Sequence, residues 1–130
     1  MTDKKLWKAF SEYIRLRDAD ENGICKCFTC GLRRHWKQMD AGHGLSRQHW
    51  GARYNEKNVH AQCKRCNGFE GGKREVYKEN VDKIYGHGTW AFMELACKRA
   101  KKLSQFEVDV LEKHYKAKSA ELRNKKTIKS

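Results

Sequence analysis

Apolar side chains recur at helical spacing near the start of the chain. Between residues 4 and 17 the spacing i, i+3, i+4, i+7 defines a stripe formed by Leu6, Trp7, Phe10, Tyr13, Ile14 and Arg17. Such a stripe gives a helix one apolar face and one charged face. The pattern predicts an amphipathic helix over residues 4–17, which the polar and glycine residues between Asp18 and Gly23 bring to an end.

Two further helical patterns lie in the C-terminal half. Residues 74–85 precede a stop at Gly86, and their apolar side carries Tyr77, Val81, Ile84 and Tyr85. Thr89 is predicted to cap the next helix. The apolar side of that helix carries Trp90, Met93, Cys97 and Ala100.

The last helix is predicted to begin at a capping box, in which Ser104 and Glu107 each bind an otherwise unpaired amide. Leu103 and Val108 stand where a hydrophobic staple would pack. The helix should continue to about Leu122, and residues 124–130 should fray. Its apolar side carries Val108, Leu111, Tyr115 and Leu122.

The segment between these helices has no sustained period and contains two C-x-x-C pairs. Residues 24–39 are predicted to form a knuckle between short strands, with Gly31 in its tight turn. Residues 40–57 contain three glycines and are predicted to be an irregular loop. Residues 58–67 should lead into a short helix that ends at the pair Gly71-Gly72.

These patterns predict one α+β domain over residues 1–130, mostly helical. It comprises an N-terminal helix (1–20), a metal-stapled core (24–73) and a basic helical C-terminal region (74–130). Apolar residues make up 38% of the chain and charged residues 35%. The hydrophobic core must therefore be small, and a structural metal would supply stability that it lacks.

Composition also limits the partners of the protein. No apolar run approaches the roughly 18 residues of a membrane-spanning helix, and residues 1–13 lack the apolar segment of a secretory signal. We therefore expect a cytoplasmic protein with reduced thiols and no membrane partner. The net charge is +13, with eleven Lys/Arg against four Asp/Glu in residues 98–130. Such an excess fits nucleic acid, although a basic tail that only aids solubility is the alternative.

The four cysteines of the two pairs are candidate zinc ligands: Cys27, Cys30, Cys63 and Cys66. Four thiolates complete a tetrahedral site with no open position, so the predicted Zn²⁺ is structural. Thioredoxin-like redox chemistry is the alternative, but it normally uses one pair in a βαβ context. Cys25 is interpreted as a spare thiol, and Cys97 as a small core residue.

Asp40, His43 and Asn67 stand close to these cysteines in the sequence. A carboxylate and an amide oxygen are hard ligands that suit Mg²⁺ or Mn²⁺. A neutral histidine can take a proton from water. Each residue alone fits an ordinary role, as a turn residue, a loop residue or a helix cap, but together they predict a metal-assisted phosphodiesterase site.

The runs CFTCG, DAGH and NVHAQCKRCN resemble the HNH, or ββα-metal, nuclease pattern, and more narrowly the phage recombination endonuclease family NinG or Rap. The run YIRLRDAD is similar to that family too, so the resemblance covers residues 7–85. The layout is also similar to phage endonuclease VII, in which the acid stands three residues before the histidine. The resemblance implies a zinc-stapled ββα-metal core, cleavage of branched DNA such as Holliday junctions and D-loops, and, for a phage protein, the host-cell cytoplasm.

The resemblance also implies roles for individual residues. His43 takes the position of the general base, Asp40 and Asn67 those of the catalytic metal ligands, and Asn58 that of the asparagine that pins the loop of the base. His60 is left open between a phosphate contact and a structural histidine. DNA would be held by basic residues near the site: Arg47, Arg53, Lys64, Arg65, Lys73 and Arg74.

A four-way junction has two symmetric strands to cut, so a homodimer acting on branched or double-stranded DNA is expected. Two alternatives remain open from the sequence. One is a sequence-specific HNH nicking endonuclease, and the other is a zinc module that binds nucleic acid without catalysis.

Overall fold

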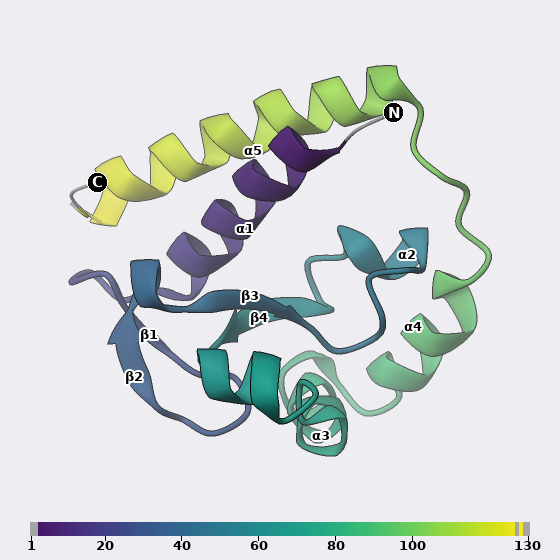
Figure 1. Cartoon of the computed structure of the whole chain (residues 1–130), viewed down its shortest axis with the longest axis horizontal. Helices are drawn as coiled ribbons and strands as arrows, with labels where there is room; N and C mark the ends of the chain where they lie inside the picture. Colours follow the sequence, from purple (N-terminus) through teal and green to yellow (C-terminus); the bar gives the residue numbers. More distant parts are fainter. Residues whose placement is uncertain (1–2, 127, 129–130) are drawn as a thin grey trace.

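The computed structural model describes residues 3–126 and residue 128 and shows a mostly helical α+β fold (Figure 1). Its α-helices are α1 (Lys4–Asp18), α2 (Trp50–Arg53), α3 (Arg74–Tyr85), α4 (Thr89–Cys97) and α5 (Gln105–Lys126). The strands are β1 (Ile24–Lys26), β2 (Arg33–His35), β3 (Asp40–His43) and β4 (Val59–Gln62). Two short turns, η1 (Trp36–Gln38) and the π-helical η2 (Arg65–Phe69), complete the fold.

Helices α1 and α5 pack side by side along one edge of the molecule (Figure 1). They run in the same direction, because Phe10 packs edge-on against Tyr115 with ring centroids 4.8 Å apart, and Glu12 pairs with Arg123 further along. At the end of α1, Lys126 Nζ donates at 2.8–3.1 Å to the carbonyl oxygens of Leu16, Arg17 and Ala19. An ammonium group at the carboxyl end of a helix accepts no hydrogen bonds but donates them to the last carbonyl oxygens, and its positive charge interacts favourably with the negative end of the helix dipole.

The end of α1 also anchors strand β4. Asp18 Oδ2 accepts a hydrogen bond from the Ala61 amide at 2.8 Å. The Arg17 guanidinium donates to the carbonyl oxygens of Glu56 and Val59, both at 2.8 Å. Arg17 and Asp18 are the last two residues of α1, and their contacts fix β4 where it meets the core between α1, β3 and α5.

Strands β1 and β2 pair antiparallel and form the predicted knuckle, with Gly31 at φ +80°. The Sγ atoms of Cys27, Cys30, Cys63 and Cys66 all lie within 4.8 Å of one another. Burial alone would raise the pKa of Cys27, but hydrogen bonds from the backbone at Cys63 and from the Thr29 hydroxyl lower it to about 6. These hydrogen bonds favour the thiolate form of Cys27, and the cluster could hold a structural metal ion such as zinc.

The two remaining cysteines lie outside this cluster, as predicted. Cys25 is buried, and burial raises its pKa to about 12, so it stays a thiol and donates to the Arg15 carbonyl oxygen at 3.1 Å. Cys97 is buried in the core between α2, α3 and α4, beside Trp90 and Met93.

The prediction of an irregular loop over residues 40–57 is wrong for two parts of the segment. Asp40–His43 forms strand β3, which pairs antiparallel with β4 and places Asp40 opposite Gln62 and His43 opposite Val59. Trp50–Arg53 forms the single-turn helix α2. The run DAGH has little intrinsic strand propensity, so its extended form depends on pairing with the buried strand β4.

Several smaller predictions need correction. The segment 58–67 begins with strand β4 before it becomes helical at η2. Gly88, not Thr89, precedes α4, and the Trp90 amide is bound by the Asp82 carboxylate at 2.9 Å. On α3, Ile84 is 60% exposed instead of buried, because α4 covers only the side of α3 that carries Tyr77 and Val81.

The Ser104–Glu107 capping box is confirmed by reciprocal hydrogen bonds of 2.9 and 3.1 Å. Helix α5 then continues to Lys126, four residues past the predicted end, because Lys126 and Arg123 are held by α1. Of the residues expected to fray, positions 127, 129 and 130 lie outside the described residues. Within residues 3–126 and 128, no helix has both the length and the apolar character needed to cross a membrane.

The cysteine cluster generates a stability prediction. Replacing Cys63 by Ser should release the bound zinc and lower the free energy of unfolding by several kcal/mol, because metal binding is coupled to folding in such sites. Cys25→Ser is the matched control, since its thiol is buried but outside the cluster. Zinc content by elemental analysis and the melting temperature measure the effect. An unchanged melting temperature in Cys63→Ser would contradict the role of the cluster.

Candidate active site

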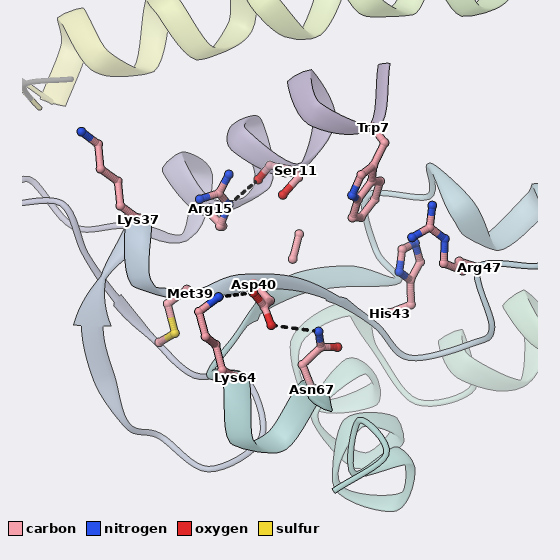
Figure 2. Close-up of a pocket in the computed structure, with 11 residues that line it drawn as sticks. Trp7, Ser11, Arg15, Lys37, Met39, Asp40, His43, Arg47, Lys64 and Asn67 are labelled. Carbon is pink, nitrogen blue, oxygen red and sulfur yellow. Dashed lines mark hydrogen bonds and ion pairs between the residues drawn. The ribbon is translucent and has the colours of Figure 1, made fainter. Parts of the chain in front are cut away.

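Asp40, His43 and Asn67 line one pocket of about 530 Å³, together with side chains from α1 and from the loop after β3. Figure 2 shows the pocket beneath α1, with Asp40 and His43 on β3 and Asn67 below them on η2. The full lining consists of Trp7, Ser11, Arg15, Lys37, Met39, Asp40, Ala41, His43, Arg47, Lys64 and Asn67. The structure thus brings together the three residues predicted to carry the chemistry.

The Asp40 carboxylate is the acidic centre of the pocket. Its Oδ1 accepts a hydrogen bond from Lys64 Nζ at 2.7 Å, and its Oδ2 accepts one from Asn67 Nδ2 at 3.1 Å (Figure 2). The carboxylate and the amide are therefore in direct contact, although 27 residues separate them in the chain. In this contact the amide presents its nitrogen, not its oxygen, to the carboxylate. A carboxylate oxygen and an amide oxygen are the kinds of hard ligand that Mg²⁺ or Mn²⁺ would take, with water and phosphate at the other positions.

His43 is held on two sides. Its Nε2 lies 2.9 Å from the carbonyl oxygen of Arg53, and its ring stacks on Trp7 with centroids 5.1 Å apart. Burial lowers the pKa of His43 to about 4, with a further contribution from the charges of Arg47 and Arg53. The imidazole is therefore neutral at pH 7. Because a carbonyl oxygen only accepts, Nε2 carries the hydrogen and Nδ1 keeps the lone pair that can accept a proton.

Three lining residues from α1 were not foreseen as part of the site: Trp7, Ser11 and Arg15. They are spaced i, i+4, i+8, so they form one stripe on the helix. In the sequence, the polar residues Ser11 and Arg15 beside the apolar stripe of this helix were the available sign that it faces a site. Arg15 is also tied to the fold, because its guanidinium donates to the carbonyl oxygens of Ser11 (3.1 Å) and Trp36 (3.2 Å).

Asn58 is completely buried and fastens the loop between β3 and β4. Its Oδ1 accepts from the Leu45 amide at 2.7 Å, and its Nδ2 donates to the carbonyl oxygens of Leu45 and Ala52, both at 3.1 Å. The next residue after Ala52 is Arg53, whose carbonyl oxygen binds His43. Asn58 therefore fixes the loop whose Arg53 carbonyl oxygen contacts His43, and its role in the proposed catalytic site stays a prediction.

His60 does not line the pocket and is instead buried among aromatic side chains. The Tyr77 hydroxyl donates to the Gly42 carbonyl oxygen at 2.6 Å, so its oxygen is left to accept from His60 Nδ1 at 3.1 Å. His60 Nε2 then accepts from the Tyr85 hydroxyl at 2.8 Å, and the ring stacks on Phe28 at 3.9 Å. Burial lowers the pKa of His60 to about 4. This geometry favours the structural alternative for His60.

Of the six basic residues predicted to hold DNA, two line the pocket. Arg47 lies with its guanidinium 5.0 Å from the Trp7 ring, and Lys64 binds Asp40. Arg15 and Lys37 are two lining cations that the prediction did not include.

The other four lie outside the lining of the pocket. Arg53 pairs with Asp3 at 3.0 Å and helps to hold α2 against the start of α1. Arg65 and Lys73 both pair with Glu70, at 3.1 and 3.0 Å. Arg74 is exposed on α3. Contacts of these four with DNA stay predictions.

The buried histidines generate a pH prediction. The pKa of His43 and of His60 is about 4 in the folded protein, against the ordinary value of 6.5. Between these values the unfolded chain binds more protons, so the free energy of unfolding should fall as the pH is lowered from 6.5 towards 4. Urea unfolding at a series of pH values measures this slope. His60→Phe should flatten it and the exposed-site control His87→Phe should not; equal slopes in all three proteins would refute the assignment.

Comparison with known proteins identifies the family of the chain. Residues 2–126 match the family described as Bacteriophage Lambda NinG protein. Searches among curated proteins and among solved structures each found no match. The family match spans both cysteine pairs, the β3–β4 strands and every lining residue of the pocket. The chain therefore belongs to the NinG family.

Proposed function

We propose that this chain is a metal-dependent endodeoxyribonuclease that cleaves branched recombination intermediates such as Holliday junctions and D-loops. The observation that carries the proposal is the convergence of Asp40, His43 and Asn67 on one pocket. The element order β3, β4, η2 and α3 supports a ββα-metal core. Membership of the NinG family supports a role in phage recombination.

The proposed reaction is in-line hydrolysis of a phosphodiester. His43 Nδ1 accepts the proton of the attacking water, since this nitrogen carries the lone pair at neutral pH. The Trp7 ring and the Arg53 carbonyl oxygen hold the plane of the imidazole, so the base needs no reorientation. A divalent cation on Asp40 and Asn67 would stabilise the charge that grows on the phosphate and on the leaving 3′ oxygen. The expected products carry 5′-phosphate and 3′-hydroxyl ends.

The charge of the pocket supports a phosphate as the ligand. Four lining cations, Arg15, Lys37, Arg47 and Lys64, surround one lining carboxylate, that of Asp40. The net charge of +13 extends this attraction to the rest of the surface. A homodimer remains our proposal for cutting both strands of a junction, because one pocket per chain serves one strand.

Cleavage mapping with defined substrates tests the proposal. The zinc-loaded protein and Mg²⁺ are incubated with a four-way junction, a plain duplex and single strands of the same sequence. We expect paired cuts near the branch point of the junction and little cleavage of the duplex. Sequence-dependent cuts in the duplex would favour the nicking alternative, and binding without any cut would favour the non-catalytic alternative.

Replacing His43 by Ala should reduce the cleavage rate at least about 100-fold, because the general base is lost. Junction binding should change little, since a neutral imidazole contributes no charge to phosphate contacts. Single-turnover cleavage and gel shifts measure the two effects. His87→Ala, at an exposed position outside the pocket lining, is the control. Cleavage by His43→Ala at the wild-type rate would rule out His43 as the base.

Junction binding should also weaken steeply with salt, because cationic side chains release counterions from the phosphates. The slope of log K against log salt is about −0.9 for each phosphate neutralised. Replacing Arg47 by Met removes one lining cation and should make the slope less steep by about one phosphate. Gel shifts between low and physiological salt test this, and affinity independent of salt would contradict an electrostatic mode of DNA binding.

A further inference from the structure

Gln62 lies beneath the proposed active site and is completely buried. Its Nε2 donates two hydrogen bonds of 3.0 Å, to the Thr29 hydroxyl and to the Gly72 carbonyl oxygen. Its Oε1 is buried without a hydrogen-bond partner. Leaving a buried acceptor unpaired costs about 1–3 kcal/mol. An uncompensated cost of this kind beside a functional site calls for a reason.

The unpaired oxygen of Gln62 lies next to the Asn67 amide. A Cβ atom placed on Gly42 would lie 1.8 Å from Gln62 Oε1 and 3.0 Å from Asn67 Oδ1. The two oxygens therefore border the same small space, which exists because position 42 has no side chain. Two acceptors that face one space cannot bind each other, so the arrangement lacks one hydrogen-bond donor.

The Asn67 amide can supply this donor by turning over. In the present orientation its Nδ2 donates to Asp40 Oδ2, and its Oδ1 is on the side of Gly42. A rotation of the amide by half a turn exchanges the two ends. Nδ2 would then face Gln62 Oε1, and Oδ1 would face the Asp40 carboxylate. Two oxygens side by side repel each other unless a cation lies between them.

We propose that Gln62 is the residue that holds Asn67 in its metal-binding orientation. In the cation-bound state, Asn67 Nδ2 donates to Gln62 Oε1 and Asn67 Oδ1 joins Asp40 as a ligand. Gln62 is thus a positioning residue that touches neither substrate nor metal. The inference rests on the proposed function, because it presumes that Asp40 and Asn67 bind a divalent cation.

The same geometry gives Gln62 Oε1 a partner only when the cation is bound. The hydrogen bond that forms then adds to the affinity of the site, since partners that orient a metal ligand are typically worth 10- to 100-fold in metal affinity. Gly42 is required for the same reason, because any side chain there would occupy the space of the Gln62 oxygen.

Mn²⁺ binding to the zinc-loaded full chain without DNA tests the inference, measured by titration calorimetry and by the electron paramagnetic resonance of free Mn²⁺. Gln62→Met keeps the length of the side chain but removes the acceptor, together with the Nε2 donor that binds Thr29 and Gly72, and it should weaken binding about tenfold. Gln62→Glu keeps an acceptor oxygen and should bind Mn²⁺ at least as tightly as wild type. Gln48→Met, on the exposed loop, is the matched control and should bind as wild type does.

Repeating the Gln62→Met substitution in the Asn67→Asp variant distinguishes a positioning role of Gln62 from a general structural role. In Asn67→Asp the two side-chain oxygens are equivalent, so no amide needs to be oriented. Adding Gln62→Met to Asn67→Asp should therefore leave Mn²⁺ affinity unchanged within about twofold, given the usual additivity of uncoupled sites. An equal loss in both backgrounds, or no loss in either, overturns the inference.

A spectroscopic readout keeps the test valid even if Gln62→Met fails to fold. In wild type, saturation with Mg²⁺ should shift the side-chain amide resonances of Asn67, as its protons move from Asp40 to Gln62. Unmoved resonances would overturn the inference. Asp40→Asn distinguishes the two levels of the proposal: Mn²⁺ binding that does not need Asp40 refutes the metal site itself, whereas Asp40-dependent binding that ignores Gln62 refutes only the positioning role.

Discussion

The four-cysteine cluster is the constraint on which the candidate site depends. Cys27 and Cys30 belong to the β1–β2 knuckle, whereas Cys63 and Cys66 join the end of β4 to η2. Asn67 directly follows Cys66, so a metal ion held by the cluster would fix the position of Asn67 beside Asp40 from one residue away. Five residues of π-helix would have little stability of their own. With a metal ion bound, the cluster would give η2 the rigidity that the proposed role of Asn67 needs.

The other wall of the pocket depends on the helices at the two ends of the chain. Helix α1 presents Trp7, Ser11 and Arg15 to the pocket, and α5 holds α1 in place along its whole length. The Lys126 ammonium at the end of α5 binds the last carbonyls of α1. The basic C-terminal region thus has a structural role, since α5 sets the position of the helix that covers His43.

Local signals predicted the parts of this fold that have local causes. The helical stripe of α1, the glycine of the knuckle, the Ser104–Glu107 capping box and the two cysteine pairs are each specified by residues close together in the sequence. Strand β3 and helix α2 were missed because a glycine-rich segment takes its form from β4 and from the Asn58 hydrogen bonds. The motif singled out Asp40, His43 and Asn67, which do line one pocket, but not the residues of α1 that line it with them.

The sequence does not reveal how the side chains of those residues are oriented, or which other residues they contact. That Trp7 stacks on His43 depends on how α1 crosses β3, which no local pattern encodes. The same holds for basic residues: Arg53 and Arg65 look like DNA contacts by composition, but each already has a carboxylate partner. The unpaired oxygen of Gln62 is visible only when the position of every neighbouring donor is known.

The contacts of Asp40 satisfy its carboxylate without any cation, and this bears on the proposed metal site. The carboxylate is satisfied by Lys64 and Asn67, so no unpaired charge destabilises the fold. The Lys64 side chain is 66% exposed, and exposed ion pairs of this kind are worth only about 0–1 kcal/mol. The proposed divalent cation would therefore displace the lysine from the carboxylate at small cost, whereas a buried partner would oppose its binding. Because Lys64 lies between Cys63 and Cys66, the same cysteine-bearing turn that positions Asn67 also places this exposed charge in the lining of the pocket.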